Sequence, residues 1–128
     1  MPKVTYRPGS GLVQETGSGF SITGAPITQD QEQLTIATTE TATLTSYGVS
    51  RLTTTGGTSG TITLPDGDLV GQMKTVILES DGGDAVLSVT NHVTSAPEVF
   101  TAADATDILV LVWNGTKWAT VHAGGWAT

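Results

Sequence analysis

The 128-residue sequence predicts an all-β fold, either an antiparallel β-sandwich or a jelly-roll-like barrel, with an extended N-terminal arm. Two observations lead to this prediction. Threonine makes up about a fifth of the residues and, with valine, favours strands because branching at Cβ suits a pleated surface. No long window repeats apolar residues with the 3.6-residue period of a helix. The length fits one domain with one core.

Residues 1–31 are predicted to form the arm, and residues 32–128 the β-sandwich domain. Three prolines and five glycines in the arm disfavour the interior of a regular sheet. Apolar residues nevertheless recur there, including Val4, Tyr6, Leu12, Phe20 and Ile22. This pattern is typical of an arm that lies on a protein surface, its own or a neighbour's. A local hairpin across residues 17–19 remains the alternative.

Alternation of apolar and polar residues from Leu34 onward predicts short strands separated by glycine-rich turns. Strands are expected around residues 34–36, 42–44, 49–52, 61–65, 72–80, 85–90 and 99–100. Residues 80–84 (SDGGD) predict a hairpin turn between two of these strands, because glycine tolerates the positive φ that such turns need.

The strongest pattern lies in residues 107–122, where Asn114-Gly115 separates two β-rich runs and predicts a hairpin with a two-residue loop. In that register Leu111 lies opposite Trp118. One face then carries Leu109, Leu111, Trp113 and Trp118, and the other carries Ile108, Val110, Val112, Ala119 and Val121.

Both faces of this hairpin are apolar, whereas a hairpin with one solvent-exposed face alternates apolar and polar residues along each strand. We therefore expect a second sheet on one side and the arm or a sister subunit on the other. A central strand covered by the chain's own loops is the alternative. The residues expected to contact another protein subunit are Val4, Tyr6, Leu12, Phe20, Ile22, Leu109, Leu111, Trp113, Trp118 and Trp126.

The charge balance argues against several partners, since five Lys and Arg face twelve Asp and Glu for a net charge of −7. Nucleic acid and anionic membranes both need clustered cations. Lys3 and Arg7 are interpreted as part of a solvated arm. There is no cysteine, so disulfides and thiolate sites are excluded and assembly in a reducing cytoplasm is favoured. Neither a secretory apolar segment nor a membrane span is visible.

No catalytic or cofactor motif is present, so the chain is predicted not to be an enzyme, with no cofactor and no small-molecule substrate. His92 and His122 lack zinc-site spacing and any triad-like spacing. The sequon at residues 114–116 is interpreted as turn chemistry.

Aspartates in glycine-rich turns, namely Asp66, Asp68, Asp81 and Asp84, could hold calcium through oxygen ligands. Asx-turn hydrogen bonds explain them without a metal.

Four segments, 63–65, 71–76, 82–90 and 108–118, together resemble structural proteins of tailed bacteriophages, including marine and cyanobacterial phages. The shared pattern is a TLP strand, a Gly-Gln-x-Lys-Thr-Val turn and strand, a Gly-Gly turn with a Val-rich return, and an apolar strand before Asn-Gly and Lys-Trp. The N-terminal VTYRPGSGLVQ is similar to that of small capsid-associated proteins.

The resemblance implies a β-sandwich or jelly-roll-like module, commonly a trimer near capsid threefold positions. We therefore expect a decoration or cement protein on the outer surface of the virion, assembled in the host cytoplasm. Its partners would be the major capsid protein and its own copies. The alternative is a tail-fibre or head-fibre module that binds a host receptor or glycan, for which Trp126 is the candidate aromatic contact.

Overall fold

The regular structure is entirely β in the computed structural model, which describes residues 4–7, 11–14 and 29–128, and this confirms the all-β prediction. No helix in this part of the chain could cross a membrane. The strands are β1 (Val4–Arg7), β2 (Gly11–Gln14), β3 (Gln31–Ala37), β4 (Ala42–Thr43), β5 (Gly48–Thr55), β6 (Thr61–Leu64), β7 (Met73–Ser80), β8 (Ala85–Val89), β9 (Glu98–Ala102), β10 (Ile108–Trp113) and β11 (Trp118–Gly124).

Strands β3 to β11 form two sheets, one ordered β11-β10-β7-β5-β3 and the other β4-β6-β8-β9. The prediction of antiparallel sheets is wrong for part of each sheet, because β3, β5 and β7 are parallel neighbours, as are β4, β6 and β8. Within these two sheets, the antiparallel strand pairs are β8–β9, β7–β10 and β10–β11. Neither sheet closes into a barrel among these nine strands.

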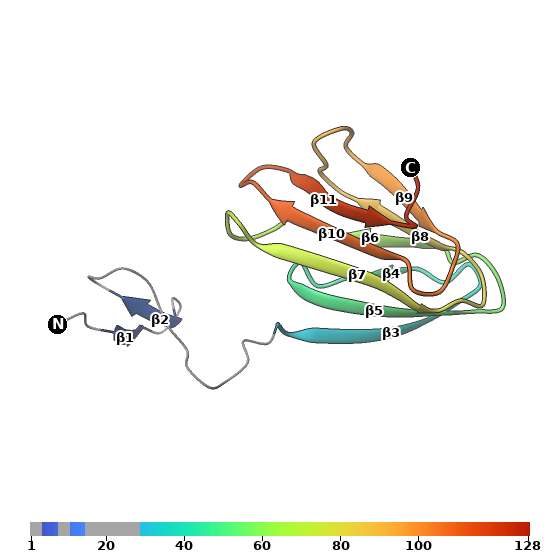
Figure 1. The fold of residues 1–128 in the computed structure, drawn as a ribbon, viewed down its shortest axis with the longest axis horizontal. Coiled ribbons are helices and arrows are strands. Elements are labelled where there is room, and N and C mark those ends of the chain that lie inside the picture. The colour runs from blue at the N-terminus through green and yellow to red at the C-terminus, as the bar shows by residue number, and fades with distance from the viewer. Residues whose placement is uncertain (1–3, 8–10, 15–28) are drawn as a thin grey trace.

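The parallel pairs arise because the chain coils, passing from one sheet to the other and back (Figure 1). Parallel neighbours need a crossover connection, and here the strand of the opposite sheet provides it. We call each strand of the larger sheet, with its corner and the following strand of the smaller sheet, a rung. The rungs are β3–β4, β5–β6 and β7–β8, and β9 to β11 complete the two sheets.

Corners of successive rungs stack on one another at one end of the molecule. The Thr39 backbone N–H donates to the Thr58 carbonyl at 3.1 Å, and the Ser59 N–H donates to the Asp84 carbonyl at 2.9 Å. The predicted hairpin at residues 80–84 is therefore wrong: β7 and β8 lie in different sheets. A Cβ on Gly83 would lie 2.2 Å from the Gly57 carbonyl carbon, so glycine serves the close stacking of two corners.

The β10–β11 hairpin exists, but its register differs from the predicted one by two residues. Trp113 pairs with Trp118 and Leu111 with Thr120, followed by a bulge. The loop holds four residues because the Asn114 side-chain oxygen accepts hydrogen bonds from the Thr116 and Lys117 backbone N–H groups. A shift of two residues leaves every side chain on its predicted face before the bulge.

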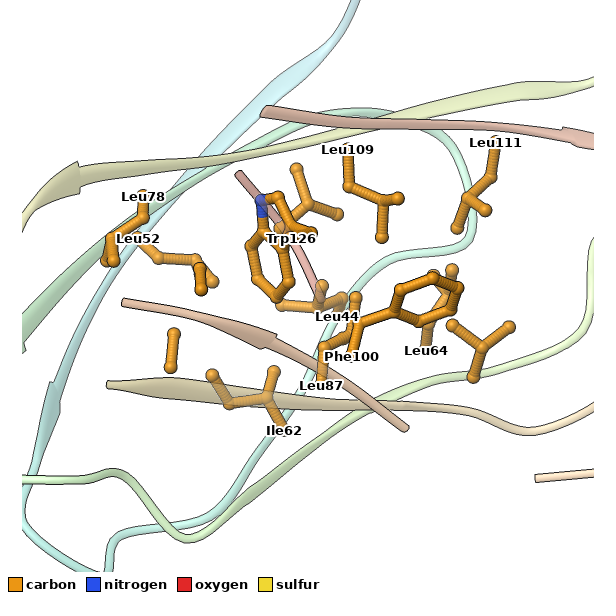
Figure 2. Packing of buried hydrophobic residues seen from close by; sticks show 14 of the residues in the cluster. Leu44, Leu52, Ile62, Leu64, Leu78, Leu87, Phe100, Leu109, Leu111 and Trp126 are labelled. Carbon is orange, nitrogen blue, oxygen red and sulfur yellow. The ribbon is translucent and has the colours of Figure 1, made fainter. Parts of the chain in front are cut away.

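One apolar cluster lies between the sheets and draws on both (Figure 2). Its largest members include Trp118, Leu52, Leu78 and Leu109 from the five-stranded sheet and Ile62, Leu64 and Leu87 from the other. Trp126, after the last strand, returns into this cluster and is 4% exposed.

The N-terminal region contains a two-stranded antiparallel ribbon, in which β1 pairs with β2 and Tyr6 lies opposite Leu12. The alternative hairpin across residues 17–19 lies outside the described residues, as do Phe20 and Ile22. Strand β3 begins at Gln31, one residue before the expected domain boundary.

Candidate functional site

Five of the predicted contact residues lie inside their own chain. Leu109, Leu111 and Trp118 are 0% exposed, Trp126 is 4% exposed and Trp113 is 5% exposed. These side chains fill the space between the sheets and leave almost no surface for a partner. Among the predicted arm residues, Val4 and Tyr6 lie on β1 and Leu12 on β2, away from both sheets in the pairing order.

The opposite face of β10 forms part of an outer sheet surface. Ile108, Val110 and Val112 are only half-buried, and their cross-strand neighbours on β7 are Ile77, Thr75 and Met73. The alternative in which the chain's own loops bury this face is therefore not seen in the described residues, and its cover by the arm or a sister subunit stays a prediction. This outer face is apolar, and it reaches the exposed side chain of Met73 at one end.

Four loops meet at that end of the molecule, which we call the loop end: residues 44–47, 65–72, 90–97 and 114–117. Hydrogen bonds link each of these loops, or the strand end beside it, to another of the four. The Gln72 amide donates to the Ser46 carbonyl at 2.6 Å, the Trp113 N–H donates to the Gln72 carbonyl, and the Trp118 N–H donates to the Asn91 carbonyl. The loop end is thus one connected surface rather than four separate turns.

Exposed large apolar side chains concentrate at or beside the loop end. Of seven such residues in the described part of the chain, five lie there: Tyr47, Leu69, Val70, Met73 and Val93. Leu69 is 73% exposed and Val70 is 77% exposed, and both occupy the same turn. Adjacent exposed aliphatic residues of this kind are typical of contact surfaces.

The turn that presents Leu69 and Val70 is held in place by the core. The Gln72 side-chain oxygen accepts hydrogen bonds from the Asp68 and Leu69 backbone N–H groups at 2.9 and 3.0 Å. Gly67 lies against Trp113, where a Cβ would come within 2.4 Å of the indole. A partner that binds here therefore meets an ordered turn, which lowers the entropic cost of association.

The opposite end, where the rung corners stack, has a different character. Its acidic residues are Glu40, Glu79, Asp81, Asp84, Asp104 and Asp107, and none of the exposed large apolar residues named above lies there. Arg51 forms an ion pair with Glu79. The two ends therefore differ in exposed apolar side chains, whereas acidic residues occur at both, with Asp66 and Asp68 at the loop end.

A buried charge cluster supports the loop end from inside. Lys74 is 0% exposed, and its Nζ donates to Glu32 Oε1 at 3.2 Å, Thr45 Oγ1 at 3.2 Å and the Tyr47 carbonyl at 3.0 Å. Glu32 also accepts from Ser50 and from the Thr45 backbone N–H. The cluster therefore ties β3, β5 and β7 to the loop that carries Tyr47.

Burial alone would raise the pKa of Glu32, but hydrogen bonds from Ser50 and Thr45 and the charge of Lys74 outweigh it and lower that pKa. Burial lowers the pKa of Lys74 more than the Glu32 carboxylate raises it.

His92 is 3% exposed and bridges β11 to the loop of residues 90–97. Its Nε2 lies 3.0 Å from Thr120 Oγ1, and its Nδ1 lies 2.7 Å from Thr94 Oγ1. Thr94 in turn donates to Glu98 at 2.7 Å. Burial lowers the pKa of His92, and the nearby Glu98 charge offsets part of that shift. A pocket opens beside this chain of hydrogen bonds.

Three of the turn aspartates accept hydrogen bonds within the protein, one from a backbone N–H and two from side chains. Asp81 accepts from the Gly83 N–H, Asp66 accepts from the Asn91 amide, and Asp68 accepts from the Ser46 hydroxyl. No group of three potential metal ligands occurs within the described ranges.

No protein-family model matches this sequence, and no curated protein matches it.

Sequence reasoning missed the loop end and the pocket. The Leu69-Val70 pair was visible as two consecutive apolar residues inside a polar turn. The chain from Thr120 through His92 to Glu98 joins residues far apart in the sequence, so no local pattern could have revealed it.

Proposed function

We propose that this chain is a structural virion protein that docks on a phage capsid through its loop end, with no catalytic role. The observation that carries the proposal is the exposed Leu69–Val70 turn, held rigid by Trp113 and Gln72. The resemblance of the C-terminal half to tailed-phage structural proteins supports the choice of a capsid as the partner. The two-sheet arrangement is also compatible with the sandwich module that the resemblance implies.

In this proposal the loop end faces the junctions between major capsid proteins, and the corner end faces solvent. The outer face of the five-stranded sheet, around Val110, would meet sister copies in a trimer. Docking of this kind needs roughly 1,200–2,000 Å² of total buried surface. The loop end and the arm would contribute that area together.

The test is co-sedimentation of the purified chain with expanded shells of the phage that encodes it. Leu69→Asp combined with Val70→Asp should weaken binding at least about tenfold, because two desolvated aliphatic contacts become charged. Thr58→Asp with Ala105→Asp, exposed positions at the corner end, is the matched control and should bind normally. No binding by the natural chain, or undiminished binding by the loop-end variant, contradicts the proposal.

A receptor- or glycan-binding appendage module is the second candidate. Trp126 is not available as the aromatic contact to a glycan, because its ring is buried. Tyr47 at the loop end is 48% exposed and can stack on a sugar. Glycan-array binding that is lost in Tyr47→Ala, together with no affinity for capsid shells, would favour this candidate.

A further inference from the structure

A pocket of about 580 Å³ opens where the loop of residues 90–97 meets β9 and β11. Its lining residues are His92, Val93, Thr94, Glu98, Phe100, Ala119, Thr120 and Thr128. Val93 belongs to both the pocket and the exposed loop end. The pocket is therefore continuous with the surface proposed above for docking.

The direction of each hydrogen bond beside the pocket follows from Glu98. A carboxylate only accepts, so the Thr94 hydroxyl hydrogen points to Glu98 Oε2 at 2.7 Å. Nδ1 of His92 must then donate to Thr94 Oγ1, which leaves Nε2 as the acceptor for the Thr120 hydroxyl hydrogen. The Thr94 backbone N–H lies 3.4 Å from Nδ1 and could donate to it only in the other tautomer, which would leave the shorter 2.7 Å contact between Nδ1 and Thr94 Oγ1 without a hydrogen.

These directions leave the polar side of the pocket rich in acceptors. The hydroxyl hydrogens of Thr94 and Thr120 are both used in hydrogen bonds to Glu98 and His92, while Thr120 Oγ1 still has lone pairs that can accept. Glu98 is half-buried, and its second oxygen has no hydrogen-bond partner within the described part of the chain. The Thr128 hydroxyl at the rim can accept as well. A ligand that fits must bring hydrogen-bond donors and, to match Glu98, a positive charge.

The remaining walls suit an alkyl stem. Val93, Ala119 and the edge of Phe100 supply apolar surface next to the acceptors. Lysine and arginine side chains combine an apolar stem with a cationic donor head. We propose that this pocket receives the side chain of a lysine or arginine that projects from the protein docked at the loop end. The identity of that protein rests on the proposed function, but the chemistry of the pocket does not.

The probe is Nα-acetyl-lysine methylamide, titrated into the full-length protein while backbone amide resonances are followed by NMR. Saturable shifts are expected in residues 92–98 and 119–120. The norleucine analogue, which has the stem without the charge, should bind at least about tenfold more weakly, since hydrogen bonds between charged groups contribute that much or more.

Two variants locate the interaction. Glu98→Gln should weaken lysine binding at least about tenfold, and Thr120→Val, at an exposed position, should weaken it to a smaller extent. Asp104→Asn, an acidic position at the corner end, is the control and should bind as the natural chain does. The proposal is overturned if the lysine probe gives no saturable shifts, if the norleucine analogue binds equally well, or if neither pocket variant loses affinity. None of these results bears on docking through Leu69 and Val70, which the co-sedimentation experiment tests separately.

Discussion

At the scale of single residues, the least expected feature is a lysine with no exposed surface in the core face of β7. Charges are rarely buried without a partner, because desolvation costs several kcal/mol per ion. Lys74 offsets that cost with one carboxylate from β3 and with one hydroxyl and one carbonyl from the loop of residues 44–47. Period-two alternation along residues 72–80 places Lys74 on the same face as Val76 and Leu78, but a local pattern gives no sign of Glu32 as the partner.

Glu32→Gln should lower the free energy of unfolding by about 3 kcal/mol, because it leaves a buried ammonium without its counter-charge. Glu79→Gln is the matched control: it removes the partner of Arg51 in a partly exposed pair and should cost less than about 1 kcal/mol. Chemical denaturation of both variants measures the difference. Equal losses would show that the buried pair contributes no more than the surface one.

His92 should make stability depend on pH in mildly acid solution. Burial lowers the pKa of His92 below the ordinary value of 6.5, so the unfolded chain binds the proton more readily than the folded chain. The free energy of unfolding should therefore fall as the pH drops below 6.5 toward the lowered pKa, and the contribution should be complete above 6.5.

Thermal unfolding between pH 7.5 and 5 checks this. His92→Gln should flatten the profile in that window, while His122→Gln, which removes the exposed histidine, should leave the slope unchanged. A slope that persists in His92→Gln would assign the effect to other groups.

At the scale of elements, the sequence predicted well which face of a strand is buried, but it predicted poorly which strands lie side by side. Period-two alternation assigned Leu109, Leu111 and Trp113 to one face of β10, and all three are buried. Alternation carries no information about which strand lies alongside, so the parallel neighbours of β5 and β7 were missed. Glycine pairs were read as hairpin turns, but a glycine needed for the close approach of two corners has the same local signature.

Gly83 gives a direct test of corner stacking. Gly83→Ala should destabilise the fold by at least about 2 kcal/mol, because the new Cβ would overlap the Gly57 backbone. Ser80→Ala, an exposed position just before the same corner, should change stability little. Denaturant midpoints compare the two, and a Gly83→Ala variant as stable as the natural protein would refute a tight contact between corners.

At the scale of the whole molecule, the arm and the domain differ in charge. Residues 1–31 hold two of the five cations and two of the twelve acids, so the other ten acids lie in the rest of the chain. Strands β1 and β2 pair with each other and with neither sheet. An isolated two-stranded ribbon is only marginally stable in water, so we expect the arm to gain most of its stability from a docked surface.

Deletion of residues 1–24 should therefore leave the domain folded but abolish binding to capsid shells. Circular dichroism should show an unchanged unfolding transition, since β3 to β11 keep every partner strand. Full binding by the truncated protein would assign docking to the loop end alone, and a collapsed transition would show that the arm belongs to the core.

The stacked rungs carry a consequence for how such a chain can change its size. Each rung rests on the one before it through parallel pairing and one corner contact, and its two loops emerge at fixed ends. A segment made of one rung and the loop that follows it, such as residues 48–72, can be duplicated without altering the register of its neighbours. An added rung would widen the loop end by one strand spacing in each sheet, while the distance from the loop end to the corner end stays set by the length of the strands.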